Sequence, residues 1–249
     1  MKIVVFGASG LVGQGALREC LLDPAVTSVV TVGRSPSSAS DPKLRHVVHG
    51  DFGDLSPVAS ELAGADACFY CMGVTSAGLT EAEYTPVTHD YALEAARVVG
   101  GTFVYVSGEG ADAGSKTMWA RVKGRTENEL LALDRPVFVL RPGFIQPLHG
   151  ITSRTRIYRY LYSWSSWLYP VLRKVAPKYV TTTELLGRAM VALAKGAQAE
   201  RVLRSDGINR VAGCRSTRRS ASTRKTGTRS RTSSSPCAAD VAARRSRCR

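Results

Sequence analysis

The sequence predicts an α/β fold with a doubly wound parallel sheet and a small helical region on its carboxyl side. Short runs rich in Val and Phe alternate with longer amphipathic segments over the first 141 residues, which is the rhythm of successive βαβ units. Three closely spaced glycines separate the first strand from the first helix. A chain of 249 residues with 44% hydrophobic residues is long enough to bury one large core.

This alternation predicts six strands joined by crossover helices. The strands are expected at 2–6, 28–32, 45–49, 67–72, 102–107 and 137–141. Helices are expected at 11–22, near Val58, at 84–99 and at 116–133. Two further helices, expected at 157–175 and 181–196, belong to a segment from about residue 144 that we expect to cover the substrate side. The second opens on TTTE with capping-box spacing and closes on a glycine.

The strongest functional signal is the segment FGASGLVG at the end of the first strand. Its three glycines have GxxGxxG spacing and precede a helix, whose N-terminus offers amide donors and a favourable dipole to a pyrophosphate. The first glycine permits a tight turn, the second a close approach of the backbone to the ligand, and the third close packing of the helix. We therefore expect a Rossmann-type dinucleotide site that contains Gly7, Ala8, Ser9, Gly10, Leu11, Val12 and Gly13.

Arg34 ends the second strand, where an NAD-specific site usually carries an acid for the ribose 2′-hydroxyl. A guanidinium can bind a 2′-phosphate through two parallel hydrogen bonds and can stack on adenine. The sequence therefore favours NADP over NAD, although NAD stays possible and Arg34 can also be read as a solvated surface residue.

Two further strand ends supply candidate cofactor contacts. Asp51 can accept a hydrogen bond from the adenine amino group beside Phe52, but Asp51 is equally suited to a simple turn. The fourth strand ends in Cys71, Met72 and Gly73, at the sheet edge where open α/β folds bind ligands. Cys68 and Cys71 form a CxxC, but residues three apart on a strand face opposite ways, so we interpret them as core thiols and expect no metal site.

The segments GASGLVG, VGRS, HGDF, YVSGEGAD, WARVKGRTENEL and LRPGFI, in this order, resemble the atypical short-chain dehydrogenases/reductases. The resemblance covers about residues 1–150 and extends to the Tat-interacting-protein-like oxidoreductases and bacterial NAD-dependent epimerase/dehydratases. It implies a Rossmann fold with NADP or NAD as cofactor. It also implies a catalytic serine after the fifth strand, and a tyrosine and a lysine spaced as YxxxK.

Ser107 matches the serine of this family and Lys123 matches the lysine, but Trp119 stands at the tyrosine position. An indole N–H donates a hydrogen bond and does not exchange a proton near neutral pH. Tyr105, Tyr158 and Tyr160 are alternative acids without a supporting motif. Lys123 and Ser107 keep a cofactor-binding role even without chemistry. Pro142 and Gly143, with Phe144, follow Arg141 at the end of the sixth strand and are secondary cofactor or substrate candidates.

The net charge of +14 is concentrated at the carboxyl end. Residues 214–249 contain ten arginines and Lys225 against the single acid Asp240, a net +10, so residues 1–213 carry only +4. This tail has no aromatic residue, and we expect it to be disordered. A nucleic-acid-binding tail and a non-native end both fit; we favour the second and expect no nucleic-acid partner for the folded residues.

An aromatic segment follows the predicted sheet. Between Tyr158 and Tyr169, six of the twelve residues are aromatic, with arginines and Lys174 around them. A lid over an apolar pocket, an interfacial helix in peripheral contact with a membrane, and packing against the sheet or a second subunit of a homodimer all fit.

The compartment is expected to be the cytoplasm, because the six cysteines lack the spacing of a disulfide framework. The chain begins with a strand rather than a signal peptide and has no apolar run long enough to cross a bilayer. We expect an NADP-dependent oxidoreductase or epimerase/dehydratase-like enzyme acting on an unidentified small molecule. The alternative is a non-catalytic dinucleotide-binding regulator or redox sensor, because Trp119 replaces the tyrosine.

Overall fold

The computed structural model describes residues 1–35, 39–151 and 179–213, and these belong to one compact unit, Met1–Ser216. The predicted aromatic helix at 157–175 and the basic tail at 214–249 lie outside the described residues. In the part of the chain that is described, no helix is both long enough and apolar enough to span a bilayer.

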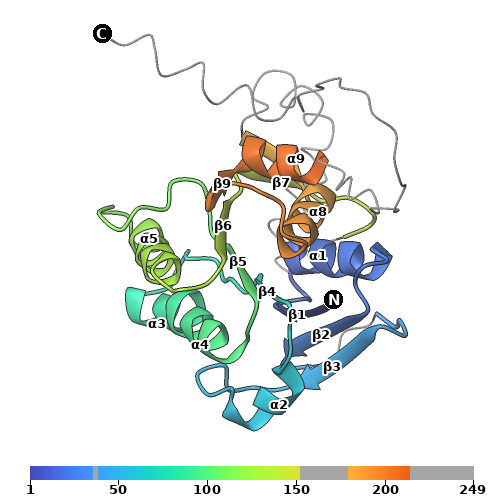
Figure 1. Ribbon diagram of the computed structural model, residues 1–249. Coiled ribbons are helices and arrows are strands. Elements are labelled where there is room, and N and C mark those ends of the chain that lie inside the picture. Colours follow the sequence, from blue (N-terminus) through green and yellow to red (C-terminus); the bar gives the residue numbers. More distant parts are fainter. Residues whose placement is uncertain (36–38, 152–178, 214–249) are drawn as a thin grey trace, which may run out of the picture. The chain divides into compact units, whose positions relative to one another are not determined.

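A seven-stranded parallel sheet forms the centre of this unit (Figure 1). Its strand order is β3-β2-β1-β4-β5-β6-β9, so the chain starts in the middle, runs to one edge and then returns to build the other half. The strands are β1 (Lys2–Phe6), β2 (Ser28–Gly33), β3 (Leu44–Val48), β4 (Ala67–Tyr70), β5 (Thr102–Val106), β6 (Val137–Arg141) and β9 (Val202–Arg204). The predicted doubly wound sheet is confirmed.

Helices cover both faces of the sheet (Figure 1). One face carries α3 (Glu81–Thr85), α4 (Tyr91–Val98) and α5 (Met118–Leu131), with the short α2 (Ala59–Leu62) nearer the β3 edge. The other face carries α1 (Leu11–Leu22), α8 (Thr183–Ala194) and α9 (Ser205–Gly213). Two hydrophobic clusters result, one on each face, because successive residues of a strand point to opposite sides.

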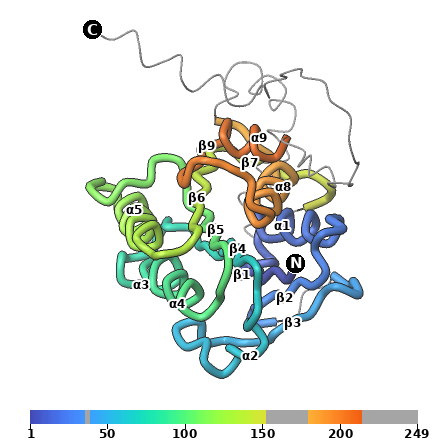
Figure 2. Tube along the Cα trace, viewed as in Figure 1, coloured from blue at the N-terminus to red at the C-terminus, as the bar shows by residue number. Residues whose placement is uncertain are grey.

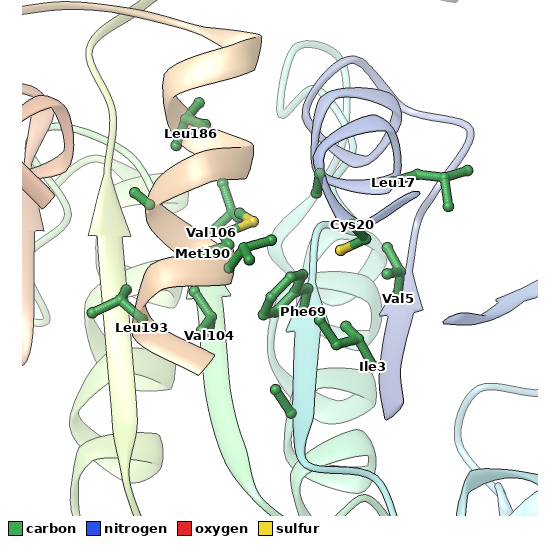
Figure 3. Packing of buried hydrophobic residues seen from close by; sticks show 14 of the residues in the cluster. Ile3, Val5, Leu17, Cys20, Phe69, Val104, Val106, Leu186, Met190 and Leu193 are labelled. Carbon is green, nitrogen blue, oxygen red and sulfur yellow. The ribbon is translucent and has the colours of Figure 1, made fainter. Parts of the chain in front are cut away.

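Figure 3 shows the cluster beneath α1 and α8, where Ile3, Val5 and Phe69 of the sheet meet Cys20 and Met190 of the helices. All five side chains are fully buried. Since β1 and β4 lie at the centre of the sheet, this cluster holds their carboxyl ends in a rigid frame.

The structure contains strands that the sequence did not predict. β9 extends the sheet beyond β6, with Leu203 opposite Leu140, and β7 (Phe144–Gln146) pairs with β8 (Val180–Thr182) in a separate two-stranded parallel sheet. Each of these strands has only three residues, which is too short for an alternation of apolar and polar residues to be recognised in the sequence. Each is a strand because a distant partner supplies the ladder hydrogen bonds.

The helix predicted at 84–99 is divided into α3, the π-helical turn η2 (Pro86–Asp90) and α4. It begins earlier than predicted, because the Thr80 side chain and Glu83 form a capping box. Pro86 has no amide hydrogen to donate, so the helical hydrogen bonds change register there.

The helix predicted at 181–196 exists as α8, but its cap and its partners differ from the prediction. Thr182, and not Thr181, is the N-cap and accepts a hydrogen bond from the Leu185 amide. The Thr181 hydroxyl instead donates to Asn209 of α9. Figures 1 and 2 show α8 beside α1, and its buried face belongs to the core. This helix therefore covers a face of the sheet.

Candidate functional site

A cavity of about 1020 Å³ opens at the carboxyl ends of β1, β2, β4 and β5. It lies where the strand order reverses between β1 and β4, which is the position at which open α/β sheets bind ligands. Its lining brings together nearly all the predicted cofactor residues: Gly7, Ala8, Ser9, Gly10, Leu11, Val12, Arg34, Phe52, Cys71, Met72, Gly73, Lys123, Pro142 and Gly143.

The glycine loop requires glycine for two separate reasons. Gly7 has a φ of +74°, and a Cβ there would lie 2.7 Å from the Met72 amide nitrogen. Gly13 is buried under the loop, where a Cβ would lie 2.1 Å from the Gly7 carbonyl oxygen. Gly10 is the N-cap of α1 and lines the cavity. Gly13 itself does not line the cavity, which agrees with the packing role expected of it.

The end of β2 presents Arg34 and Ser35 at the cavity. Both residues are exposed, and no acidic side chain in the described part of the chain forms an ion pair with Arg34. Arg34 therefore has its guanidinium available at the position where a dinucleotide carries its adenosine ribose.

Asp51 does not line the cavity, in contrast to the prediction that it contacts adenine. Its carboxylate accepts a hydrogen bond of 2.9 Å from the Gly53 amide, which is the turn role that the sequence left open, and its contact with adenine stays a prediction. Phe52 does line the cavity, and its ring centroid lies 5.8 Å from that of Tyr91. These two rings form an apolar wall near β3.

Cys68 and Cys71 face opposite sides of the sheet, as their spacing predicts. Cys68 is fully buried in the cluster beneath α4 and α5, whereas Cys71 packs against the cluster beneath α1 and also borders the cavity. Burial raises the pKa of both thiols, that of Cys71 to about 12. Both are therefore neutral near pH 7, and neither is an activated thiolate.

Ser107 and Lys123 both line the cavity, at its β5 side. Ser107 is 7% exposed, and its Oγ has no hydrogen-bond partner among the described residues. Lys123 is half-buried on α5, with its Nζ 3.4 Å from the Val106 carbonyl oxygen and 5.5 Å from the centre of the Tyr105 ring. Burial lowers the pKa of Lys123 to about 8, against an opposing contribution from the carboxylate of Glu127.

Trp119 lies one helical turn before Lys123, where its indole ring packs over the loop after β5. A Cβ on Gly108 or on Gly110 would lie 3.7 Å from ring atoms of Trp119. Trp119 does not line the cavity.

Tyr105 does not replace the missing tyrosine. Its hydroxyl is buried and donates to the Thr88 carbonyl oxygen at 3.1 Å, and burial raises its pKa far above the usual range. The alternatives Tyr158 and Tyr160 lie outside the described residues.

Arg141, which precedes Pro142, is engaged in an ion pair rather than in the cavity. Its guanidinium binds both carboxylate oxygens of Glu127, a residue of α5 that is only 1% exposed. Gly143 lines the cavity and donates its amide to the Ser205 hydroxyl at 3.0 Å, which ties this loop to α9. Phe144 is not part of the lining.

Several lining residues carry no motif and were not predicted. Val87 and Tyr91 enter from η2 and α4, and Ile145 enters from β7. The capping box at Thr80 and the proline at 86 are the sequence signals that mark this helix as irregular, and π-helical turns are frequent at functional sites. Neither signal identifies which side chains face the cavity.

This chain is similar in sequence to fungal fmp52 proteins and to HTATIP2. A mitochondrial fmp52 protein of Emericella nidulans is 35% identical over 157 residues, which are 58% of this chain and 66% of that protein. FMP52-1 of Scheffersomyces stipitis is 30% identical, with 58% of this chain and 67% of that protein covered, and HTATIP2 of Rattus norvegicus is 30% identical, with 58% and 62% covered. The chain thus spans about two thirds of the length of these relatives. No family model matches it.

Solved structures of low sequence identity share the fold. A short-chain dehydrogenase/reductase from Burkholderia thailandensis has a TM-score of 0.62 at 17% identity, covering 82% of this chain and 91% of that one. A UDP-glucose 4-epimerase has a TM-score of 0.61 at 15% identity, covering 85% and 80%. The sheet, the glycine loop and the cavity define a dinucleotide-binding Rossmann protein. Together with the relatives, they show that the chain belongs to the atypical short-chain dehydrogenase/reductase family.

The expected cytoplasmic location is contradicted by these comparisons. The fungal relatives are named as mitochondrial proteins. The cysteine pattern excluded a disulfide scaffold, but a reducing environment is not unique to the cytoplasm, and the inference from cysteines to that compartment was wrong.

Proposed function

We propose that this chain binds NADP(H) in the cavity and transfers hydride to or from a small carbonyl or alcohol substrate. The observation that carries this proposal is the continuity of the cavity, which joins the glycine loop and Arg34 to Ser107 and Lys123. Its volume of about 1020 Å³ has the size of a site for a cofactor with a small ligand.

The residues present fit a dinucleotide. Because Gly7 and Gly10 have no side chains, the backbone at the N-terminus of α1 is accessible, and a pyrophosphate can reach the amide donors there. The Ser107 hydroxyl is buried without a partner in the described residues, and a buried polar group in that state is costly unless a ligand satisfies it. Lys123 Nζ makes one long hydrogen bond and has further donors for ribose hydroxyls.

NADP is favoured over NAD because Arg34 forms no ion pair with the described residues and no acid follows β2 at residues 34 and 35. Replacement of Arg34 by Ala should weaken binding of NADPH about tenfold or more, since a charge-assisted hydrogen bond contributes about 1.5–3 kcal/mol. Binding of NADH should change less than about twofold. Calorimetric titration of the full chain measures both affinities.

Arg45→Ala is the matched control, because Arg45 is also an exposed arginine on this half of the sheet and pairs with Glu61 away from the cavity. It should leave both affinities unchanged. An equal loss of NADPH and NADH affinity in Arg34→Ala would contradict the assignment of Arg34 to the 2′-phosphate.

Bound NADPH supplies a hydride, and the chain must orient the carbonyl and provide a proton. Ser107 is suited to donate a hydrogen bond to the carbonyl oxygen, because its Oγ is buried at the cavity and has no partner within the described ranges of the chain. Epimerases and dehydratases of this fold class also begin with hydride transfer, so the same site fits an epimerase/dehydratase-like reaction. The substrate is a small molecule in either case.

A regulator without turnover is the second candidate, and Trp119 is the observation that favours it. The indole packs over Gly108 and Gly110, outside the cavity lining, and has no proton to transfer near neutral pH. In this alternative the chain binds the nucleotide and responds to its occupancy, but it catalyses no reaction.

Replacement of Trp119 by Tyr distinguishes the two candidates. An enzyme should show NADPH oxidation with some members of a panel of aldehydes and ketones, and Trp119→Tyr should increase this rate, by up to about 10²-fold if the phenol reaches the carbonyl. Trp119→Phe is the control, because it removes the indole without adding an acid. Intact NADPH binding with no turnover in any of the three proteins would favour the regulator.

A further inference from the structure

The proton donor of the proposed reaction is not provided by position 119, and the described cavity offers few substitutes. Four ionisable side chains line it: Arg34, Cys71, Tyr91 and Lys123. A donor must have a pKa near the working pH and must lie at the same end of the cavity as the group that orients the carbonyl, Ser107.

Three of these side chains do not meet both conditions. Arg34 does not lose its proton in a protein, and the Cys71 thiol is held by burial at a pKa of about 12. The Tyr91 ring packs against Phe52, whose ring in turn packs against Phe6 of β1, and none of its ring contacts in the described residues is with Ser107 or Lys123. Two strand intervals separate β1 from β5, which is about 10 Å.

Lys123 meets both conditions. Its Nζ reaches the carbonyl oxygen of Val106, the residue that precedes Ser107 in the chain. The described groups facing it are the Tyr105 ring, which lies beneath the ammonium, and Glu127, which lies one turn further along α5. The Glu127 carboxylate is engaged by Arg141, so it does not neutralise the ammonium by direct contact.

We propose that Lys123 is the proton donor of this chain, with the Ser107 hydroxyl holding the substrate oxygen beside it. This proposal rests on the proposed NADP(H)-dependent function. In the reducing direction, hydride from NADPH bonds to the carbonyl carbon and the π electrons of the C=O bond move to oxygen. An N–H bond of the Lys123 ammonium breaks and an O–H bond forms, so the products are an alcohol, NADP⁺ and a neutral amine, which solvent reprotonates.

A proton donor at Lys123 should make nucleotide binding depend on pH, whichever substrate is used. The nicotinamide ring is cationic in NADP⁺ and neutral in NADPH, so an ammonium beside it is disfavoured only in the oxidised complex. The pKa of Lys123 is therefore lower with NADP⁺ than with NADPH. By linkage, the affinity for NADP⁺ relative to NADPH rises as pH increases through the interval between these two pKa values.

Calorimetric titration of the full chain with NADP⁺ and with NADPH, between about pH 6 and 9, tests this prediction. The ratio of the two affinities should increase about tenfold for each unit of difference between the two pKa values. Titration of the 2′-phosphate affects both nucleotides and cancels in the ratio. Lys123→Arg keeps the charge but does not titrate, so its ratio should be independent of pH.

Lys123→Met, which removes the ammonium, is a second variant at this position. Thermal unfolding checks that each variant is folded. Tyr158→Phe and Tyr160→Phe should keep the pH dependence of the wild type. A flat ratio in the wild type, a slope that persists in Lys123→Arg, or a slope that disappears only in a tyrosine variant would overturn the proposal while leaving NADP(H) binding intact. Failure of the wild type to bind either nucleotide would instead overturn the proposed function.

Discussion

Replacement of Gly13 by Ala should destabilise the protein by about 2–4 kcal/mol, the range of severe overpacking in a core. The added Cβ would lie 2.1 Å from the Gly7 carbonyl oxygen and 2.8 Å from the Ala8 Cα, and all its close neighbours are backbone atoms. α1 must therefore move away from the glycine loop, and the gain in helix propensity, about 1 kcal/mol, does not compensate. For a domain of this size the melting temperature should fall by about 5–10 °C, measured by thermal denaturation.

The matched control is Gly73→Ala. Gly73 lines the cavity, but a Cβ there would have no atom within 4 Å, so Gly73→Ala should change the stability of the protein by less than about 0.5 kcal/mol. Because α1 presents its N-terminus to the cavity, Gly13→Ala should also weaken nucleotide binding. Equal melting temperatures for the two variants would contradict the packing role of Gly13.

Replacement of Glu127 by Ala should cost about 3 kcal/mol or more of the free energy of unfolding. Glu127 is 1% exposed and is the partner of Arg141, whose side chain is 23% exposed, so its loss leaves a largely buried guanidinium without a counter-charge. Arg141 ends β6 immediately before Pro142 and Gly143 of the cavity. Urea denaturation measures this change in stability.

Glu129→Ala is the control on the same helix, because Glu129 is 46% exposed and pairs with His89 at the surface. It should cost less than about 1 kcal/mol. The double variant Glu127→Leu with Arg141→Met should recover most of the stability, since an apolar pair often replaces a buried ion pair without loss. A double variant as unstable as Glu127→Ala would show that lost packing, rather than the unpaired charge, caused the effect.

The fold class could be predicted because its signals are local. The strands β1, β2, β4 and β5 are short apolar runs that are fully or largely buried, so their pattern is strong enough to read without knowledge of their partners. The helix α1 has the predicted bounds because the glycine loop marks its start. The short β7, β8 and β9 could not be predicted in this way, because three residues become a strand only when a distant segment pairs with them.

The residues of the candidate site also fall into those that the sequence could predict and those that it could not. The glycine loop, Arg34 and Ser107 stand next to strand ends, and parallel strands bring their carboxyl ends to one edge, so sequence position alone predicts that these residues converge. Lys123 lies within α5, and only the family resemblance pointed to it. The role of Asp51 could not be predicted, because a carboxylate that contacts adenine and one that closes a turn have the same local sequence. The hydrogen bond to Gly53 shows the turn role, and the contact with adenine stays a prediction.

The sequence by itself determined the doubly wound α/β fold class, the glycine loop and the absence of a tyrosine at position 119, because these depend on residue type and spacing. Only the tertiary structure decided which polar groups lack partners. The unpaired Ser107 hydroxyl, the burial that lowers the pKa of Lys123 and the engagement of Arg141 by Glu127 all arise where β5, β6 and α5 meet. Desolvation and pairing depend on every neighbour at once, and those neighbours come from distant parts of the chain.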